Sequence, residues 1–552
     1  MSYTGSIAPL AGELRACLKC IATIAVVGGF FRAAPAQDAP ATDVAQAQTT
    51  EQKQPEAKRF NVREYRVLGN TVLGARDIER VLYPLLGDGK QLADVDAARA
   101  ALEKIYHERG FGTVFVDVPP QEVADGVVRL QVTEGRLQAK TISGARFFSD
   151  REVIAALPAA ALNEVPNLPA LQQQLATLNS QSADRSVVPV LKAGPIAGTM
   201  DVEFKVSDQL PLHGSLEVDN DYTVDTNPLR ATAALSYANL FGALDQVSLQ
   251  YQDTPQSPGQ VSVLNISYLS RPFVDGVRAN ASFTNSNSNV GAVGGGAVGV
   301  LGKGQIYSVR LSYPIQTMSQ SVQSLNLGMD YKHFRDAVTL GGGSQLVTPI
   351  YYTNLSVAYL GTWTSNAFDG GLSASVNFGP RGIPNSADAF ENKRFLGRPN
   401  YFYLRWDSSL TAHLPAGFRL NLRFAGQEAV EPLISNENFS IGGADGVRGY
   451  LEAEELGDSG IKASVQLQTP TWSRGISQLL NIFAYYDTGR TRVIDALSNQ
   501  PDGAVLRSWG GGLNMLPGHA FSGSLTWSDP LDNGSYTLAH QSRVLFLIRG
   551  TF

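Results

Sequence analysis

The segment Ile461-Lys462-Ala463-Ser464-Val465-Gln466-Leu467-Gln468 decides the fold class, because apolar and polar residues alternate strictly along it. A β-strand points successive side chains to opposite faces, so this pattern predicts a strand with one apolar and one polar face. The segment Val247-Ser248-Leu249-Gln250-Tyr251-Gln252 repeats the pattern. From Leu212 to the end of the chain the helical signal disappears, and we count 16 alternating segments. They begin near Leu212, Arg230, Gln246, Gln260, Arg278, Gln305, Ser324, Tyr351, Gly371, Asn400, Phe418, Gly460, Asn481, Val505, Ala520 and Arg543.

The length and number of these segments favour a membrane barrel over a soluble sandwich. Most have about 9 to 13 residues, the length that a tilted strand needs to cross a bilayer. A soluble sandwich would also alternate, but it would turn its apolar face inward. The connections alternate between tight turns and longer loops rich in Gly, Ser and Asn. Closure removes every unpaired strand edge, as lipid requires, so we predict a 16-stranded antiparallel outer-membrane β-barrel over residues 209–552.

The composition fits a long antiparallel sheet better than a helical enzyme. Charged residues make up only 17% of the chain, and there are 54 glycines, 20 tyrosines and 24 phenylalanines. The net charge is −6 and no basic patch is visible, so nothing points to a nucleic-acid partner. The six histidines are scattered without metal-ligand spacing, so we predict no metal and no cofactor. Gly457-Asp458-Ser459-Gly460 resembles a protease nucleophile loop, but no glycine follows it, and a turn is the better interpretation.

The N-terminal residues indicate export. Residues 1–36 are predicted to be a secretory signal peptide: Arg15 and Lys19 precede the apolar stretch Cys20–Phe31, and the small residues of Ala34-Pro35-Ala36 suit cleavage. A membrane anchor is the alternative. Residues 37–58 are rich in Gln, Ala, Thr and Pro and are predicted to be a linker or tail. Both cysteines lie inside the signal, so the mature chain cannot rely on disulfides.

Between the linker and the barrel, a small α/β order occurs twice, which predicts two modules at 59–134 and 135–208. The alternative is one irregular α+β domain. In the first module we expect a strand at 60–67, helices at 77–86 and 93–109 with a stop at Gly110, and strands at 113–118 and 126–133. In the second we expect a strand at 137–143, helices at 150–157 and 168–179, and strands at 187–191 and 199–206.

The most unusual loop of the barrel region is Gly442-Gly443-Ala444-Asp445-Gly446-Val447-Arg448-Gly449-Tyr450, within a longer connection at about 430–459. Five of its nine residues are Gly or Asp, which tolerate tight and left-handed backbone conformations. Arg448 offers a planar fork of five donors, and Asp487 is the best acceptor on a nearby strand, Phe483–Gly489. We hypothesise that the loop folds back into the barrel and is latched by this pair. The alternatives are a solvated loop arginine and an ordinary turn at Asp487 and Gly489.

Two α/β modules, 16 strands and Val447-Arg448-Gly449-Tyr450 together with Asp487-x-Gly489 resemble the two-partner secretion transporters. These are the haemolysin secretion and activation proteins of the barrel superfamily with polypeptide-transport-associated (POTRA) modules. The resemblance implies periplasmic POTRA modules that capture an unfolded, haemolysin- or adhesin-like exoprotein with an N-terminal secretion domain and pass it through the barrel. It also implies that the sixth external loop enters the lumen and that Arg448 contacts Asp487 on the barrel wall. Relatives often begin with a plug helix and a linker, and the 22 residues of 37–58 are short for both.

The remaining partners follow from the same resemblance. We expect the bilayer and lipopolysaccharide around the barrel, and the barrel assembly machinery during biogenesis. Terminal aromatics are common on barrels of this type, so Phe552 is the expected insertion signal. An assembly factor that inserts other barrels and a passive solute porin are the alternative functions. Paired modules argue against the porin, and no catalytic constellation supports an enzyme.

Overall fold

A computed structural model describes most of the predicted mature chain. The predicted signal peptide and linker, residues 1–58, lie outside the described residues. Among the described residues, no helix has both the length and the hydrophobicity to cross a bilayer. The described ranges are 59–123, 125–287, 290–293, 298–300, 303–315, 320–335, 337–339, 345–347, 349–381, 386–473, 478–518 and 520–552.

The first α/β module is a three-stranded sheet packed against helices. Its sheet has the order β2-β5-β4, with β2 parallel to β5 and β4 antiparallel to it. The buried face of α3 packs Val95, Ala98, Leu102 and Tyr106 into the module's own apolar core. Gly110 has φ +93° just after α3, which accounts for the helix stop predicted there. The elements are β1 (Phe60–Val62), β2 (Glu64–Leu68), α2 (Ala75–Leu82), η2 (Tyr83–Leu85), β3 (Gly87–Lys90), α3 (Leu92–Glu108), β4 (Val114–Asp117) and β5 (Val127–Glu134).

One sequence prediction in this module is wrong, because residues 60–67 form two strands instead of one. The chain changes partner at Arg63, whose backbone N–H donates to Gly126 O at 2.8 Å. Before that residue β1 pairs with β3, and after it β2 pairs with β5. The pairing strand β3, Gly87–Lys90, has the sequence Gly-Asp-Gly-Lys, which carries no strand signal.

The second module repeats the arrangement with its own core. Its sheet has the order β6-β8-β7, with β6 parallel and β7 antiparallel to β8. Leu171, Leu175 and Leu178 of α5 are buried against Val202 and Phe204 of β8. The elements are β6 (Arg136–Ser143), α4 (Asp150–Ala155), η3 (Pro158–Ala160), α5 (Leu168–Ser180), β7 (Arg185–Ala193) and β8 (Thr199–Asp208). The residues at which one module ends and the next begins stay predictions.

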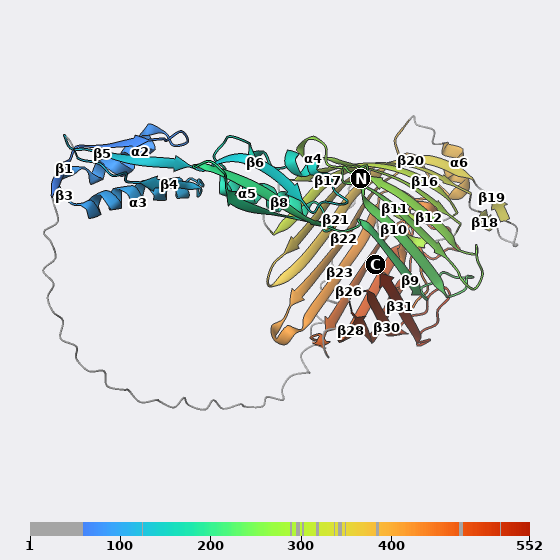
Figure 1. Ribbon diagram of the computed structural model, residues 1–552. Helices are drawn as coiled ribbons and strands as arrows, with labels where there is room; N and C mark the ends of the chain where they lie inside the picture. Colours follow the sequence, from blue (N-terminus) through green and yellow to red (C-terminus); the bar gives the residue numbers. More distant parts are fainter. Residues whose placement is uncertain are drawn as a thin grey trace, which may run out of the picture. The chain divides into compact units, whose positions relative to one another are not determined.

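The rest of the described chain is a closed antiparallel barrel, so the predicted fold class is confirmed. Figure 1 shows its long strands side by side, with green β9 meeting dark red β31 at the closure. Each of the 16 predicted segments has a long strand in the described chain, and the two-residue β27 (Trp472–Ser473) adds a short pairing to β28. The long strands are β9 (Leu212–Asp219), β10 (Arg230–Leu240), β11 (Asp245–Asp253), β12 (Ser262–Leu269), β13 (Arg278–Ser286), β16 (Gly304–Ile315), β17 (Ser321–Phe334), β20 (Ile350–Thr364), β21 (Phe368–Phe378), β22 (Phe402–His413), β23 (Arg419–Ala429), β26 (Ser459–Gln468), β28 (Gln478–Arg492), β29 (Val505–Pro517), β30 (Phe521–Pro530) and β31 (Arg543–Thr551).

The apolar face of the barrel strands points outward, which separates this fold from a soluble sandwich. Leu467 of β26 is 45% exposed, while its neighbours Ser464 and Gln466 bond to another part of the chain on the inner side. An exposed apolar belt around a closed sheet is what lipid favours and water does not. Other outward residues are Leu235, Leu249, Ile266, Tyr307, Val309, Leu311, Leu325, Leu327, Met329, Leu404, Phe424, Ile482, Trp509, Leu525, Trp527, Val544 and Ile548.

The barrel closes through a short seam between its first and last strands. β31 and β9 pair over five residue pairs, from Leu547 with Asp219 to Thr551 with Ser215. By comparison, β17 pairs with β20 along its whole length, from Ser321 to Phe334. Phe552 and Gly214 extend the seam with reciprocal backbone hydrogen bonds of 3.0 and 3.1 Å. The seam is therefore a short pairing in an otherwise extensive hydrogen-bond network.

The connections define the two ends of the barrel. The chain enters β9 directly from the second module, so the β9–β10 connection lies at the far end, and the ends alternate from there. Turns such as 241–244 and 365–367 lie at the module end. Connections such as 379–401, which carries α6 (Ala387–Lys393), and 430–458 lie at the opposite, external end.

The junction of the two modules holds a buried carboxylate, Glu134 at the end of β5. It accepts hydrogen bonds from the backbone N–H groups of Thr71 at 2.6 Å and Val72 at 3.2 Å, and from the Arg136 guanidinium at 2.8 Å. Burial alone would raise the pKa of Glu134, but the hydrogen bonds from Thr71, Arg136 and Val72 outweigh it and lower the pKa.

We predict that Glu134→Gln destabilises the module region by about 2 kcal/mol at neutral pH, because charge-assisted hydrogen bonds are lost. The pKa of Glu134 is lower in the folded chain than in the unfolded chain. Its contribution to stability is therefore fully present above the unfolded-state pKa and is lost as the pH falls through the folded-state pKa. Pulse proteolysis of the full chain between pH 7 and pH 3 should therefore show a smaller acid loss in the variant than in the wild type. Glu122→Gln, at an exposed loop residue, is the control, and equal pH profiles for Glu134→Gln and wild type would contradict the prediction.

Candidate functional site

The connection from β23 to β26, residues 430–458, contains the loop singled out from the sequence. It carries the turn η6 (Ser435–Glu437) and two short strands, β24 (Phe439–Ile441) and β25 (Glu455–Gly457). These strands pair antiparallel, from Phe439 with Gly457 to Ile441 with Glu455. The connection thus doubles back on itself, and residues 442–454 form its tip.

Glycines allow the tip to turn and to approach the wall. Gly442 and Gly443 have φ +107° and +82°, and a Cβ on Gly442 would lie 2.4 Å from Leu451 O. Side chains other than glycine are strained in this region of backbone conformation. On the wall, a Cβ on Gly489 would lie 2.9 Å from Cγ2 of Val447. Gly489 therefore makes the space into which Val447 packs.

Arg448 meets Asp487 in a two-pronged ion pair. Its Nε donates to Asp487 Oδ2 at 2.7 Å, and Nη2 donates to Oδ1 at 2.8 Å. The backbone N–H of Arg448 adds a third bond to Oδ2 at 3.2 Å. The Asp487 side chain is fully buried and that of Arg448 is 14% exposed. Such a fork fits a carboxylate in a way that lysine cannot reproduce.

Three further groups on the wall complete the surroundings of the guanidinium. Nη1 of Arg448 donates to Gln466 Oε1 at 2.8 Å, and Nη2 donates to Ser464 Oγ at 3.1 Å. The guanidinium carbon lies 3.4 Å from the centre of the Tyr485 ring, a close cation–π stack. Because Ser464 and Gln466 occupy the polar face of β26, Arg448 lies against the inner face of the barrel.

The residues flanking Arg448 anchor the tip by packing. Val447 and Tyr450 are fully buried and form an apolar cluster with Phe439, Ile441 and Leu506. The Tyr450 hydroxyl lies 2.9 Å from the carbonyl oxygen of Asp532 and accepts from the Asp532 N–H at 3.1 Å. A Cβ on Gly449 would lie 3.1 Å from Ser528 Cβ on β30, so the backbone passes close to the wall there.

The tip also contacts both sides of the closing seam. Ala444 N–H donates to Asp221 Oδ2 at 2.8 Å, in the connection that follows β9. Glu454 accepts from the N–H and the hydroxyl of Thr537 at 2.7 and 2.9 Å, in the connection before β31. Hydrogen bonds from one loop therefore reach the external ends of the first and last strands.

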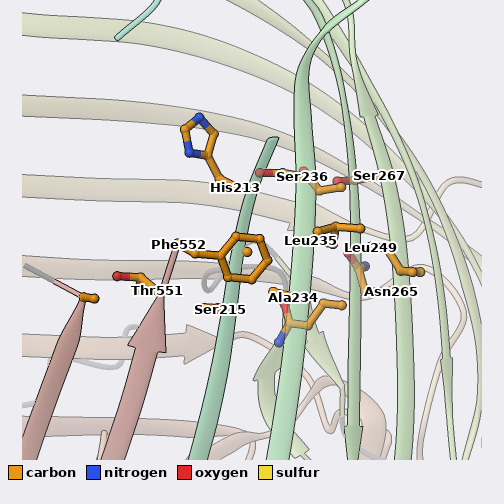
Figure 2. A pocket seen from close by; sticks show the side chains of 14 residues that line it. His213, Ser215, Ala234, Leu235, Ser236, Leu249, Asn265, Ser267, Thr551 and Phe552 are labelled. Atoms are coloured by element: carbon orange, nitrogen blue, oxygen red, sulfur yellow. The ribbon is translucent and has the colours of Figure 1, made fainter. Parts of the chain in front are cut away.

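Phe552 lies at the other end of the same seam, on the barrel's outer side. The residue is 75% exposed, and its ring covers Gly214, where a Cβ would lie 2.1 Å from the nearest ring carbon. Figure 2 shows the ring beside β9, near Ala234 and Leu235. Phe552 is among the residues that line a cavity of about 740 Å³, together with His213 and Ser215. Only glycine leaves room for this ring at position 214.

Sequence reasoning missed several partners of the loop. It identified Arg448 and Asp487 but not Ser464 and Gln466, although both are polar residues of the alternating segment that predicted the strand. Tyr485, two residues before Asp487, shares a strand face with it, and that spacing was the available signal. Within the described ranges, no group of three or more His, Asp or Glu side chains is placed to hold a metal ion.

The family models match both parts of the chain. The model for the haemolysin secretion/activation protein ShlB/FhaC/HecB matches residues 198–515, over half of the chain, and the ShlB-type POTRA domain model matches residues 60–135. The chain belongs to the ShlB/FhaC/HecB family. The resemblance deduced from Val447–Tyr450, the modules and the barrel is confirmed. As a family member the chain is an outer-membrane transporter of two-partner secretion, with its POTRA region in the periplasm.

Relatives and solved structures agree with this assignment. The outer membrane transporter CdiB of Dickeya dadantii is 23% identical over 490 residues, which cover 83% of this chain and 80% of that protein. The haem/haemopexin transporter protein HuxB of Haemophilus influenzae is 22% identical, covering 86% and 84%. The structure of CdiB from Escherichia coli matches with a TM-score of 0.58 at 20% identity, covering 91% and 93%. BamA from Haemophilus ducreyi matches with a TM-score of 0.55 at 15% identity, covering 89% and 100%, which shows a shared fold.

We predict that Arg448→Lys frees the tip although the charge is kept. Lysine cannot make the two-pronged bond or the stack on Tyr485, so about 3 kcal/mol of loop anchoring should be lost. Proteinase K should then cut within 442–454 at least tenfold faster in detergent-folded protein, while the barrel keeps its fast migration on unheated gels. Arg423→Lys is the matched control, because Arg423 makes only an exposed 3.4 Å pair with Asp445. Equal cleavage of the two variants would contradict the prediction.

Proposed function

We propose that the chain recognises one unfolded exoprotein in the periplasm and secretes it through the barrel lumen. The observation that carries this proposal is the fork of Arg448 on Asp487, which ties the 430–458 connection to the polar inner face of the barrel. A latched, movable connection suits a passage that stays shut at rest and opens for a chain. A barrel of 16 strands is wide enough to leave an aqueous passage.

The two modules are proposed to capture the cargo, as POTRA modules spanning 59–134 and 135–208. Each sheet has two edge strands, among them β4 in the first module and β7 in the second. An extended chain can add a strand to such an edge through main-chain hydrogen bonds, whatever its side chains. This mode suits an exoprotein that is still unfolded and that is recognised through its N-terminal secretion domain.

The Arg448–Asp487 pair is proposed to act as the latch of the lumen loop, with Gly442, Gly443 and Gly489 providing the space. A buried ion pair that loses one partner costs about 3 to 5 kcal/mol, so the latch holds at rest. Transport needs no fuel in this scheme, because folding of the cargo outside the cell draws the equilibrium forward. The chain is proposed to have no catalytic activity of its own.

The remaining partners are proposed from the positions of the outward apolar residues and of Phe552 on the barrel. The outward apolar belt contacts the bilayer and lipopolysaccharide. The exposed ring of Phe552, beside the seam, is proposed as the insertion signal that the barrel assembly machinery reads. An assembly factor for other barrels is the second function that the shared BamA fold leaves open.

We predict that Arg448→Ala lowers secretion of the exoprotein at least tenfold while the barrel still inserts. The buried carboxylate of Asp487 loses its partner, so the loop no longer returns to one resting position. Secretion is measured as exoprotein in the medium per amount of heat-modifiable barrel in the outer membrane. Arg423→Ala serves as the control, and undiminished secretion at normal transporter levels would remove the latch.

We predict that secretion depends on one dedicated cargo, encoded by a neighbouring reading frame. Removing the N-terminal secretion domain from that exoprotein should abolish its appearance in the medium, since the modules then have no segment to bind. Levels of unrelated outer-membrane barrels should stay constant when the transporter gene is deleted. A general loss of those barrels would instead support the assembly-factor alternative.

A further inference from the structure

An apolar core lies inside the external end of an otherwise polar lumen. It is formed by inward residues of six barrel strands, by α6 and by the segment 431–438. We call α6 and the segment 431–438 together the outer plug. Phe390 of α6 is 1% exposed, and its ring lies 5.5 Å from Tyr352 and 6.0 Å from Tyr401. The cluster is made of Val261, Val263, Ile306, Phe334, Ile350, Tyr352, Phe390, Tyr401, Tyr403, Ala429, Leu433 and Ile434.

A buried carboxylate joins this plug to the wall. Glu437, at the end of η6, is 2% exposed and accepts from Lys332 Nζ at 2.6 Å, an ion pair. It also accepts from the Tyr352 hydroxyl, and its second oxygen accepts from the Tyr403 hydroxyl at 2.7 Å. These donors come from β17, β20 and β22, so the carboxylate ties the plug to three strands of the wall.

Further bonds hold the plug together around Glu437. Gln427 on β23 is fully buried and donates to the backbone oxygen of Glu437 at 2.9 Å and to that of Asp458 at 3.0 Å. The Asp458 carboxylate in turn accepts from Leu433 N–H at 2.8 Å. Lys393 of α6 donates to Asn436 Oδ1 at 3.0 Å, which fixes the helix to the segment. Two external connections therefore close this end as one unit.

This contact is separate from the one at the loop tip. Arg448 bonds to β26 and β28, whereas Glu437 bonds to β17, β20 and β22, on a different arc of the wall. Breaking the tip contact leaves every bond of Glu437 in place. The external end of the lumen would then stay blocked by the apolar core.

We propose that Glu437 is a positioning residue that keeps the outer plug shut, as a second barrier independent of the Arg448–Asp487 pair. The proposal rests on the proposed function in that the closed lumen is taken as the transport path. Release of the tip alone is not sufficient for opening, and cargo passes only when the Glu437 contacts also break. Breaking the contacts of Glu437 costs free energy because the Lys332 side chain is only 9% exposed and would be left as a buried charge without its carboxylate.

The test measures single-channel open probability of the full-length protein in planar bilayers, without cargo. We expect Arg448→Ala to stay close to the wild type, Glu437→Gln to open more often, and the combined variant to raise the open probability on the order of a hundredfold. Glu428→Gln is the matched control, since Glu428 pairs with Arg492 at an exposed position. Unheated gels confirm that each barrel is folded before it is measured.

A rescuing substitution shows whether Glu437→Gln opens a gate or disrupts the structure in general. Lys332→Met removes the charge that Glu437→Gln leaves unpaired. When it is added to the combined variant, we expect the open probability to fall at least tenfold, toward that of the wild type. Full opening by Arg448→Ala alone, no opening in the combined variant, or no rescue by Lys332→Met would each overturn the proposal. Secretion assays on the same variants report separately on the proposed function, because a passage can open in bilayers whether or not an exoprotein is secreted.

Discussion

The structure depends on one constraint, which is that no backbone N–H or C=O group can be left unpaired in lipid. A sheet satisfies it only by closing, so the first and last strands must meet, and Asp219 of β9 pairs with the distant Leu547 of β31. The closing pair is short, and hydrogen bonds at both of its ends support it. Phe552 and Gly214 extend it at one end, and the tip of the 430–458 connection bonds to both neighbours at the other.

Closure also decides what the inside of the barrel contains. Alternation sends apolar side chains to lipid and polar ones inward, so the lumen favours groups that can hydrogen-bond. Glu437 is buried there and the side chain of Arg448 is only 14% exposed. Each is surrounded by partners that match its geometry, a carboxylate for Arg448 and an ammonium with two phenols for Glu437. Buried ion pairs add little net stability compared with apolar packing. Their effect here is to fix one position for a connection that would otherwise have several.

The sequence predicted those features that repeat locally. Alternation along segments such as Ile461–Gln468 needs no distant partner, and all 16 long strands could be predicted from it. The pair of Arg448 and Asp487 could be predicted because each lies in a conspicuous short motif. The split of residues 60–67 could not, because it depends on the distant Gly126 carbonyl that accepts from Arg63. Glu437 could not either, since its partner Lys332 is 105 residues away and each looks like an ordinary polar residue of its own segment.

Along the chain, the hairpin of β24 and β25 joins the contact of Glu437 to the contact of Arg448. Glu437 lies just before β24, and Arg448 lies beyond the glycine pair that follows it. Because β24 and β25 are hydrogen-bonded to each other, the connection can move as a paired unit that bends at Gly442 and Gly443, which already adopt positive φ. Each 1.4 kcal/mol of contact energy changes the population of an open state about tenfold. In the proposed mechanism, the contacts of Glu437 keep the external end shut even when the tip is released, so a cargo chain in the lumen has to break both contacts.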